Sequence, residues 1–295
     1  MSGDALQAHL EGGCTTVARA WAVARGDGLV LGFTDHDRDL AFEGVVFRAS
    51  SGMTARALAQ TTGLSVDNSE AAGALSDAGL TEADILAGRW DGAGVRMWLV
   101  NWADVAARRL VFRGALGEVA RAGGAFRAEL RGLAEALGVP RGRVFQARCG
   151  AVLGDAACGV DLSAPGFFAE GVLADVADGG TRLWVSGIVG HEDGWFAAGR
   201  LVVQDGPAAG LEAVIRADRA EGDRRLVELW ARIGADLVPG MALRLVAGCD
   251  KGLRTCRLKF GNVANFRGFP HVPSEDWLMA HPRQGGLNDG GSLKR

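Results

Sequence analysis

Long apolar runs are lacking from this sequence of 295 residues, and no segment approaches the roughly 20 apolar residues that a transmembrane helix needs. The opening residues, MSGDALQAHLEGG, have neither the basic start nor the apolar middle of a secretory signal peptide, so we expect folding in the cytoplasm. A large excess of one charge is lacking too. The formal net charge of −3 argues against a dedicated nucleic-acid-binding protein, which usually carries a concentrated basic face.

The arginines and histidines do not gather into a recognisable site. Short arginine-rich stretches at Arg108–Arg109, 141–148 and Arg224–Arg225 are scattered, and we interpret them as solvated faces rather than as a phosphate-binding surface. The 5 histidines are dispersed, and no HExxH, GxSxG or GxxxxGK(S/T) motif occurs. These patterns do not favour an enzyme.

Glycine is abundant at 45 residues, whereas proline contributes only 7 and tyrosine none. Abundant glycine beside alternating apolar residues predicts many short strands joined by tight turns. We expect a fold that is mainly β with short helices, with an antiparallel barrel or sandwich in each of two β-rich blocks. The predicted domains are a β-rich domain over 1–138, a second over 139–248 that opens with two cysteines, and a cysteine-bearing C-terminal segment over 249–295 that ends in a flexible tail.

Local patterns predict the individual elements. Thr81, which is followed by acidic residues, is expected to be the N-cap of a short helix. Alternation and turn residues predict a helix over 4–10, hairpins over 15–34, 40–49, 172–188 and 211–233, strands over 95–102, 110–112, 115–121 and 125–131, and a last strand over 241–247.

Four of the five cysteines form two pairs. Cys149 and Cys158 enclose eight residues, Cys249 and Cys256 enclose six, and ninety residues lie between the pairs. Nearby glycines would let the backbone wrap closely around a bulky group. They are Gly150, Gly154, Gly159, Gly248 and Gly252. The fifth cysteine, Cys14, stands alone and is interpreted as a small apolar filler.

The residues alone leave four interpretations of the paired cysteines open. Unrelated buried thiols are common, but they rarely sit in paired glycine-rich segments. Disulfides are disfavoured in the cytoplasm. Structural zinc pairs usually enclose about two to four residues, whereas an iron–sulfur cluster is larger, is normally held by four cysteines and tolerates longer loops. Spacing alone places the cluster only modestly ahead of zinc.

Charged residues near the cysteines are consistent with a cluster. Positive side chains could offset the negative charge of a cluster with four thiolates, and Asp155 and Asp250 would oppose them. The positive residues are Arg148, Lys251, Arg254, Arg257 and Lys259.

The segment DHDRD places three carboxylates and a histidine within residues 35–39. It could bind a cation or supply an acid and a base. We favour the simpler interpretation that the aspartates make Asx-turn bonds to their own backbone, because a calcium loop would need further ligands at regular spacing.

Two strings resemble the signatures of a phage-associated family found in prophages and in gene transfer agents of alphaproteobacteria. They are FTDHDRDL at 33–40 and CRLKFGNVANFRGFPHVPSED at 256–276, and the resemblance covers almost the whole chain. It implies a baseplate hub below the distal tail ring. Such hubs are generally homotrimers in which each subunit offers two tail-tube-like antiparallel β domains.

The chain is also similar, more distantly, to the tail-tip protein of lambda-like phages, which carries a four-cysteine iron–sulfur site. Carried over by position, the resemblance implies an iron–sulfur cluster, of the 4Fe–4S type, on Cys149, Cys158, Cys249 and Cys256. A zinc-stapled hub and an iron–sulfur redox enzyme are the alternatives.

The resemblance further implies a structural, non-catalytic role in a virion. The expected partners are the distal tail protein ring, a megatron-like tail-tip or fibre protein and a cell-wall peptidase, while DNA would pass through the lumen without specific binding. The segment 262–270 is expected to form a fixed loop that covers the cluster side of its domain. A docking surface for the next baseplate protein is the sharper interpretation of that loop.

Overall fold

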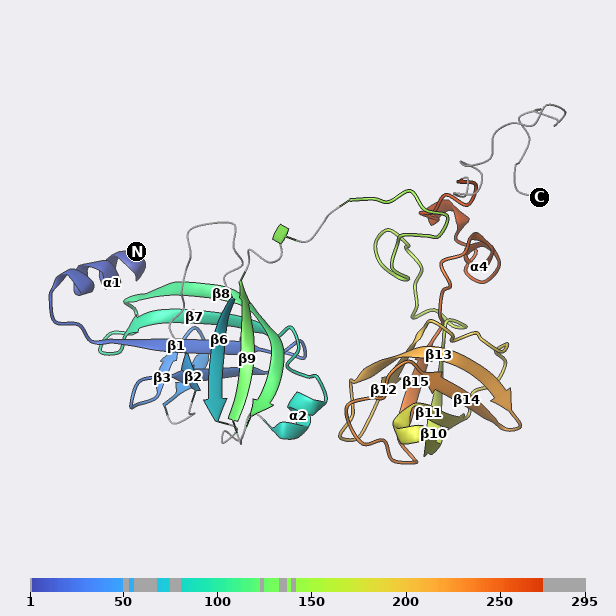
Figure 1. Cartoon of the computed structure of the whole chain (residues 1–295), viewed down its shortest axis with the longest axis horizontal. Coiled ribbons are helices and arrows are strands. Elements are labelled where there is room, and N and C mark those ends of the chain that lie inside the picture. Colours follow the sequence, from blue (N-terminus) through green and yellow to red (C-terminus); the bar gives the residue numbers. More distant parts are fainter. Residues whose placement is uncertain are drawn as a thin grey trace, which may run out of the picture. The chain divides into compact units, whose positions relative to one another are not determined.

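The computed structural model describes residues 2–49, 53–55, 68–74, 81–122, 125–132, 137–138 and 142–272. The chain divides into two compact units, Met1–Pro140 and Arg141–Arg295. Both units are built mainly of strands, as predicted (Figure 1). The three-part division at 138 and 248 stays a prediction, and the tail at 284–295 lies outside the described residues.

The N-terminal unit contains a nine-stranded sheet with the strand order β3-β4-β2-β1-β7-β8-β9-β6-β5. The strands are β1 (Val17–Ala24), β2 (Val30–Thr34), β3 (Leu40–Phe42), β4 (Val45–Arg48), β5 (Met53–Ala55), β6 (Asn68–Ala74), β7 (Gly94–Asn101), β8 (Arg108–Ala122) and β9 (Ala125–Gly132). The predicted hairpins over 15–34 and 40–49 are confirmed.

Helices α1 (Ser2–Glu11) and α2 (Glu82–Leu86) belong to the same unit. The predicted N-cap of α2 is confirmed, because Thr81 Oγ1 accepts the N–H of Asp84 at 3.1 Å. The helix predicted over 4–10 is confirmed as α1.

Both faces of β1 are buried, because its side chains alternate between two apolar clusters. Trp21 belongs to the cluster on one face. The other face carries alanines at every second position over 18–22, whose small side chains leave room for large rings. Those rings are Phe42, Phe47 and Trp98, which contact one another with centroids 4.2, 5.6 and 5.7 Å apart.

One strand pair departs from the predicted antiparallel arrangement. β2 and β4 run parallel, with Gly32 opposite Phe47. A Cβ at position 32 would lie 2.4 Å from the carbonyl oxygen of Val46, so the close approach of the two strands requires glycine. Glu43 and Gly44, which join β3 to β4, both have positive φ, at 50° and 73°, as a two-residue type I′ turn demands.

The C-terminal unit contains a closed barrel with the strand order β10-β11-β14-β13-β12-β15. The strands are β10 (Phe168–Ala177), β11 (Arg182–Ser186), β12 (Arg200–Val203), β13 (Glu212–Glu221), β14 (Arg224–Leu229) and β15 (Ala242–Val246). The short helix η1 (Asp178–Gly180) joins β10 to β11, and α4 (Leu253–Leu258) and η2 (Val263–Asn265) follow the barrel. The predicted hairpins over 172–188 and 211–233 are confirmed, and β12 was not predicted.

A single apolar cluster fills the barrel, because inward-facing side chains of all six strands meet there. Each of its most buried members is at most 1% exposed, and they include Leu173, Leu183, Leu201, Ile215, Val227 and Leu243. Of the helices that the structure describes, none is long and apolar enough to cross a membrane.

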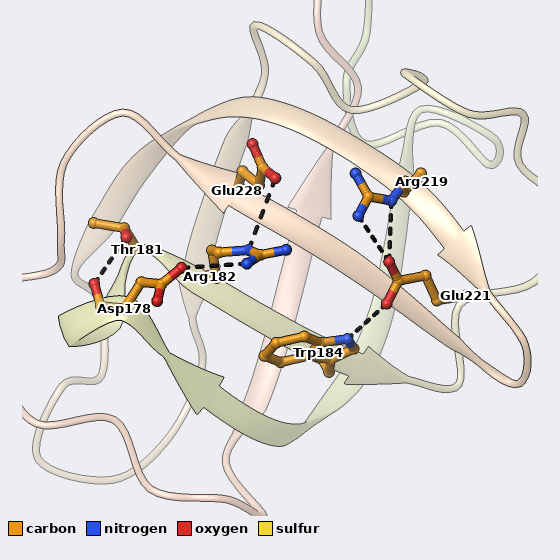
Figure 2. Close-up of polar contacts among 7 residues, drawn as sticks. All are labelled: Asp178, Thr181, Arg182, Trp184, Arg219, Glu221 and Glu228. Carbon is orange, nitrogen blue, oxygen red and sulfur yellow. Dashed lines mark hydrogen bonds and ion pairs between the residues drawn. The ribbon is translucent and has the colours of Figure 1, made fainter.

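Polar side chains form two groups of contacts on the barrel (Figure 2). Glu221 accepts from Trp184 Nε1 at 2.9 Å and from Arg219 Nη2 at 2.9 Å. Both bonds hold the pKa of Glu221 below its usual range, and the bond from Trp184 lowers it more than the bond from Arg219. Arg182 at the start of β11 donates to Asp178 of η1 at 3.3 Å.

Arg225 is buried, so its interpretation as part of a solvated face is wrong. Side chains alternate along β14, and this position points inward, where the guanidinium pairs with buried Asp218. It also donates to the carbonyl oxygens of His191 at 2.5 Å and Glu192 at 3.2 Å. Because Asp218 accepts the N–H of Phe196 at 2.9 Å as well, the ion pair fastens the segment 191–196 to the barrel.

Candidate metal centre

The first cysteine pair lies in a turn-rich segment that precedes β10. Asp155 shapes this segment, because its Oδ1 accepts the N–H of Cys158 at 2.6 Å and its Oδ2 accepts the N–H of Val152 at 2.9 Å. Both bonds hold the pKa of Asp155 below its usual range, and the bond from Cys158 lowers it the most. The carboxylate that we had considered as an opposing charge therefore forms the turn that carries Cys158.

The second cysteine pair follows β15. Gly248 approaches a neighbouring segment so closely that a Cβ there would lie 1.7 Å from the carbonyl oxygen of Ala197. This approach fixes the backbone immediately before Cys249. Cys256 lies within α4, so the stretch between the two cysteines is partly helical and not simply the loop that we had expected.

Lys251 joins the two cysteine segments. The N–H of Cys149 donates to the carbonyl oxygen of Lys251 at 2.9 Å, and Lys251 Nζ donates to the carbonyl oxygen of Ala151 at 2.6 Å. Its φ of 65° lies in the left-handed region that residues other than glycine seldom adopt. Gly268 also packs against the first segment, since a Cβ there would lie 2.8 Å from the carbonyl oxygen of Ala147.

All four paired cysteines line one small pocket, so the structure brings together the residues that the sequence grouped across ninety positions. The rest of the lining is mostly apolar, with two asparagines. The lining residues are Cys149, Ala151, Leu153, Cys158, Val160, Cys249, Lys251, Gly252, Cys256, Phe260, Asn262 and Asn265. Cys14 is exposed, which corrects its interpretation as an apolar filler.

Backbone N–H groups point at two of the sulfurs. The N–H of Arg267 lies 3.4 Å from Cys149 Sγ, and the N–H of Lys251 lies 3.4 Å from Cys249 Sγ. Such donors favour a negatively charged sulfur over a neutral thiol, because the hydrogen bond to the charged form is stronger. The pocket is therefore suited to thiolates that bind a cation.

Asn262 contacts the other two cysteines. Its Nδ2 donates to the carbonyl oxygen of Cys158 at 2.7 Å and lies 3.7 Å from the Sγ of the same residue. The backbone carbonyl oxygen of Asn262 accepts from the Cys256 thiol at 3.2 Å, and the backbone N–H of Asn262 donates to the carbonyl oxygen of Cys256 at 3.0 Å. Asn265 Nδ2 donates to Asn262 Oδ1 at 2.8 Å.

The four sulfurs also interact electrostatically. Burial raises the pKa of the Cys256 thiol, and the neighbouring charges of Cys149, Cys249 and Cys158 raise it further. Four thiolates in one pocket repel one another, so they need a positively charged partner in order to ionise together.

Lys259 attaches this region to the barrel. Its ammonium donates to the carbonyl oxygens of Trp195 and, at 2.8 Å, of Gly248, and it lies 4.5 Å from the centroid of the Trp195 ring. Burial lowers the pKa of Lys259. The residue therefore acts as a structural anchor between the end of α4 and the segment that the Arg225–Asp218 pair holds.

No three His, Cys, Asp or Glu side chains in the described ranges are gathered closely enough to hold a single metal ion. Four cysteines around one pocket supply the thiolate ligands that either a zinc ion or an iron–sulfur cluster takes.

Two carboxylates of the DHDRD segment, those of Asp35 and Asp39, bond to backbone outside their own turn, which corrects the predicted Asx-turn bonds. Asp35 Oδ1 accepts the N–H of Arg19 at 2.6 Å, and Asp39 Oδ1 accepts the N–H of Ala49 at 2.9 Å. The bonds reach neighbouring parts of the sheet rather than their own turn, so this segment fastens the sheet.

Two residues have roles at the pocket that the sequence did not reveal. We had assigned Lys259 only a charge and Asn262 only a place in a covering loop. The spacing of Asn262 and Asn265, three residues apart beside a cysteine, is the one signal that could have indicated a shared site. Nothing in the sequence indicates that Lys259 points back at backbone carbonyls.

Two family models match the chain. The model described as baseplate hub protein, N-terminal attachment domain, matches residues 3–161. The model described as phage conserved hypothetical protein BR0599 matches residues 194–276. The first match contains one cysteine pair and the second match contains the other.

A solved structure described as the virion of a native gene transfer agent (GTA) particle contains a similar chain. The two chains are 58% identical with a TM-score of 0.90, and the similarity covers 98% of this chain and 99% of that one. None of the curated proteins matches.

Proposed function

Because this chain belongs to the baseplate hub protein family, we propose that it is a structural hub of a gene transfer agent virion, linking the distal tail ring to the tail tip or fibre. The similarity to a chain of such a particle over nearly its whole length is the observation that carries the proposal. The role is structural rather than catalytic.

The hub assembles as a homotrimer in this proposal. Its neighbours are the distal tail protein ring and a megatron-like tail-tip or fibre protein, with a cell-wall peptidase as a further partner. DNA passes through the lumen of the assembly without specific binding. The near-neutral formal charge of −3 is compatible with that passage.

We propose that Cys149, Cys158, Cys249 and Cys256 hold an iron–sulfur cluster of the 4Fe–4S type. The shared pocket and the N–H groups directed at two of the sulfurs support this assignment. When bound, the cluster supplies metal–thiolate bonds that cross-link the two segments. By analogy with a covalent cross-link that closes a loop of this length, the gain in stability is on the order of 4–5 kcal/mol.

Anaerobic purification of the full chain tests the metal assignment. We expect absorbance near about 400 nm and equal amounts of iron and acid-labile sulfide, about four of each per chain. Cys256→Ser should lose iron and expose the C-terminal unit to limited proteolysis, whereas Cys14→Ser is the matched control at an exposed cysteine. Zinc without sulfide would overturn the cluster, and an unchanged cleavage pattern in Cys256→Ser would overturn the cross-link.

Removal of the gene from cells that produce the particles tests the structural role. We expect electron micrographs to show particles without a complete baseplate, and DNA transfer to fall to background. Complementation with the wild-type gene should restore both properties. Complete, active particles in the deletion strain would contradict a hub function.

A further inference from the structure

We infer that Asn262 is the positioning residue that joins the two cysteine segments before metal arrives and sets the hydrogen bonding of the Cys158 sulfur, an inference that rests on the proposed cluster site. Its contacts are divided between the two pairs. The side-chain amide of Asn262 donates to Cys158, and the backbone of Asn262 hydrogen-bonds with Cys256. These two cysteines are ninety-eight positions apart, so one residue spans both halves of the ligand set.

The orientation of the amide is defined by its own neighbour. Asn265 Nδ2 donates to Asn262 Oδ1 at 2.8 Å, which leaves the Asn262 Nδ2 group as the end that faces Cys158. The donor then lies 2.7 Å from the Cys158 carbonyl oxygen and 3.7 Å from its sulfur. An aspartate at position 262 would have almost the same shape but could donate neither bond.

The contacts at Cys256 come from the backbone of Asn262. Its backbone N–H donates to the Cys256 carbonyl oxygen at 3.0 Å, and its backbone carbonyl oxygen lies 3.2 Å from the Cys256 sulfur. Asn262 therefore holds Cys256 through its backbone while its side chain reaches Cys158.

Asn262→Asp and Asn262→Ala test this role in the anaerobically purified full chain. Val263→Ala is the matched control, because Val263 follows Asn262 directly, is exposed and does not line the pocket. We expect both Asn262 variants to lose iron to a chelator about 10–100-fold faster than the wild type, the range typical of residues that orient metal ligands. Their cluster should also have a lower reduction potential, because a donor to sulfur is lost. The control should match the wild type.

Alkylation of the metal-free protein gives a second, independent measurement. Mass spectrometry should show Cys158 reacting several-fold faster in Asn262→Ala than in the wild type, with Val263→Ala unchanged. If the wild type proves to hold no iron or sulfide, the cluster fails but this measurement still decides the role of Asn262. An unchanged alkylation rate at Cys158, or iron loss at the wild-type rate in both Asn262 variants, would overturn the inference.

Discussion

The N-terminal sheet and the C-terminal barrel bury their apolar side chains in different ways. The sheet has two apolar clusters, one on each face of β1, whereas the barrel has a single cluster enclosed by its strands. An open sheet keeps two edge strands, and a closed barrel has none. The barrel therefore has no free strand edge. The cysteine pocket lies in the C-terminal unit, which also contains the barrel.

The two units also use charge differently. In the sheet unit, the carboxylates of Asp35 and Asp39 accept hydrogen bonds from backbone N–H groups at exposed positions. The barrel instead buries a complete ion pair, Arg225 with Asp218, which holds the segment that Lys259 contacts. We therefore expect the packing around the cysteine pocket to depend on the buried Arg225–Asp218 pair of the barrel.

Arg225→Ala should have the largest effect. Removing one partner of a buried ion pair leaves Asp218 uncompensated and costs about 3–5 kcal/mol of unfolding free energy. Hydrogen exchange should show the loss across the C-terminal unit and leave the sheet unchanged. Arg224→Ala, at an exposed neighbouring position, should change stability by less than about 0.5 kcal/mol. Equal losses in the two variants would show that the buried pair does not matter.

Gly248→Ala should have an intermediate effect. The added methyl group would meet the carbonyl oxygen of Ala197, and such overpacking typically costs about 1–3 kcal/mol. We also expect reduced iron content, because the displaced backbone carries Cys249. Denaturant unfolding and iron analysis measure the two effects. Gly142→Ala, where no atom lies within 4 Å of the new Cβ, is the control and should behave as the wild type.

Glu221→Gln should have the smallest effect, visible as a change in pH dependence. The pKa of Glu221 is lowered in the folded chain, so its stabilisation is present above its usual pKa of 4.5 and is lost as the pH falls through the folded value. Between about pH 7 and about pH 3, the variant should therefore lose less thermal stability than the wild type. Glu212→Gln is a control on the same strand. Identical pH profiles for Glu221→Gln and the wild type would contradict this role.

Much of the local structure could be predicted because local patterns specify it. The turn at Asp178–Gly180 and the alternation on either side sufficed for the β10–β11 hairpin, and Thr81 sufficed for the start of α2. The strand β12 was missed because its four residues, RLVV, are few and show little alternation. The helix α4 was missed because it is only six residues long and begins at a glycine without a side-chain cap.

The sequence predicted the four cysteines of the candidate site but not the residues that hold their segments in place. Paired cysteines in glycine-rich segments, together with the family resemblance, were enough to group the four residues. The roles of Asn262 and Lys259 could not be predicted, because their partners are backbone carbonyls and sulfurs of distant segments.

The sequence by itself determined the β-rich character of both units, their hairpins and the two cysteine pairs, since each of these depends on residues close together along the chain. Only the tertiary structure decided that β2 and β4 run parallel, that Arg225 faces inward and that the two cysteine pairs share one pocket. Those outcomes depend on strand register and barrel closure. Both are set by packing among residues far apart in the sequence, which no local pattern records.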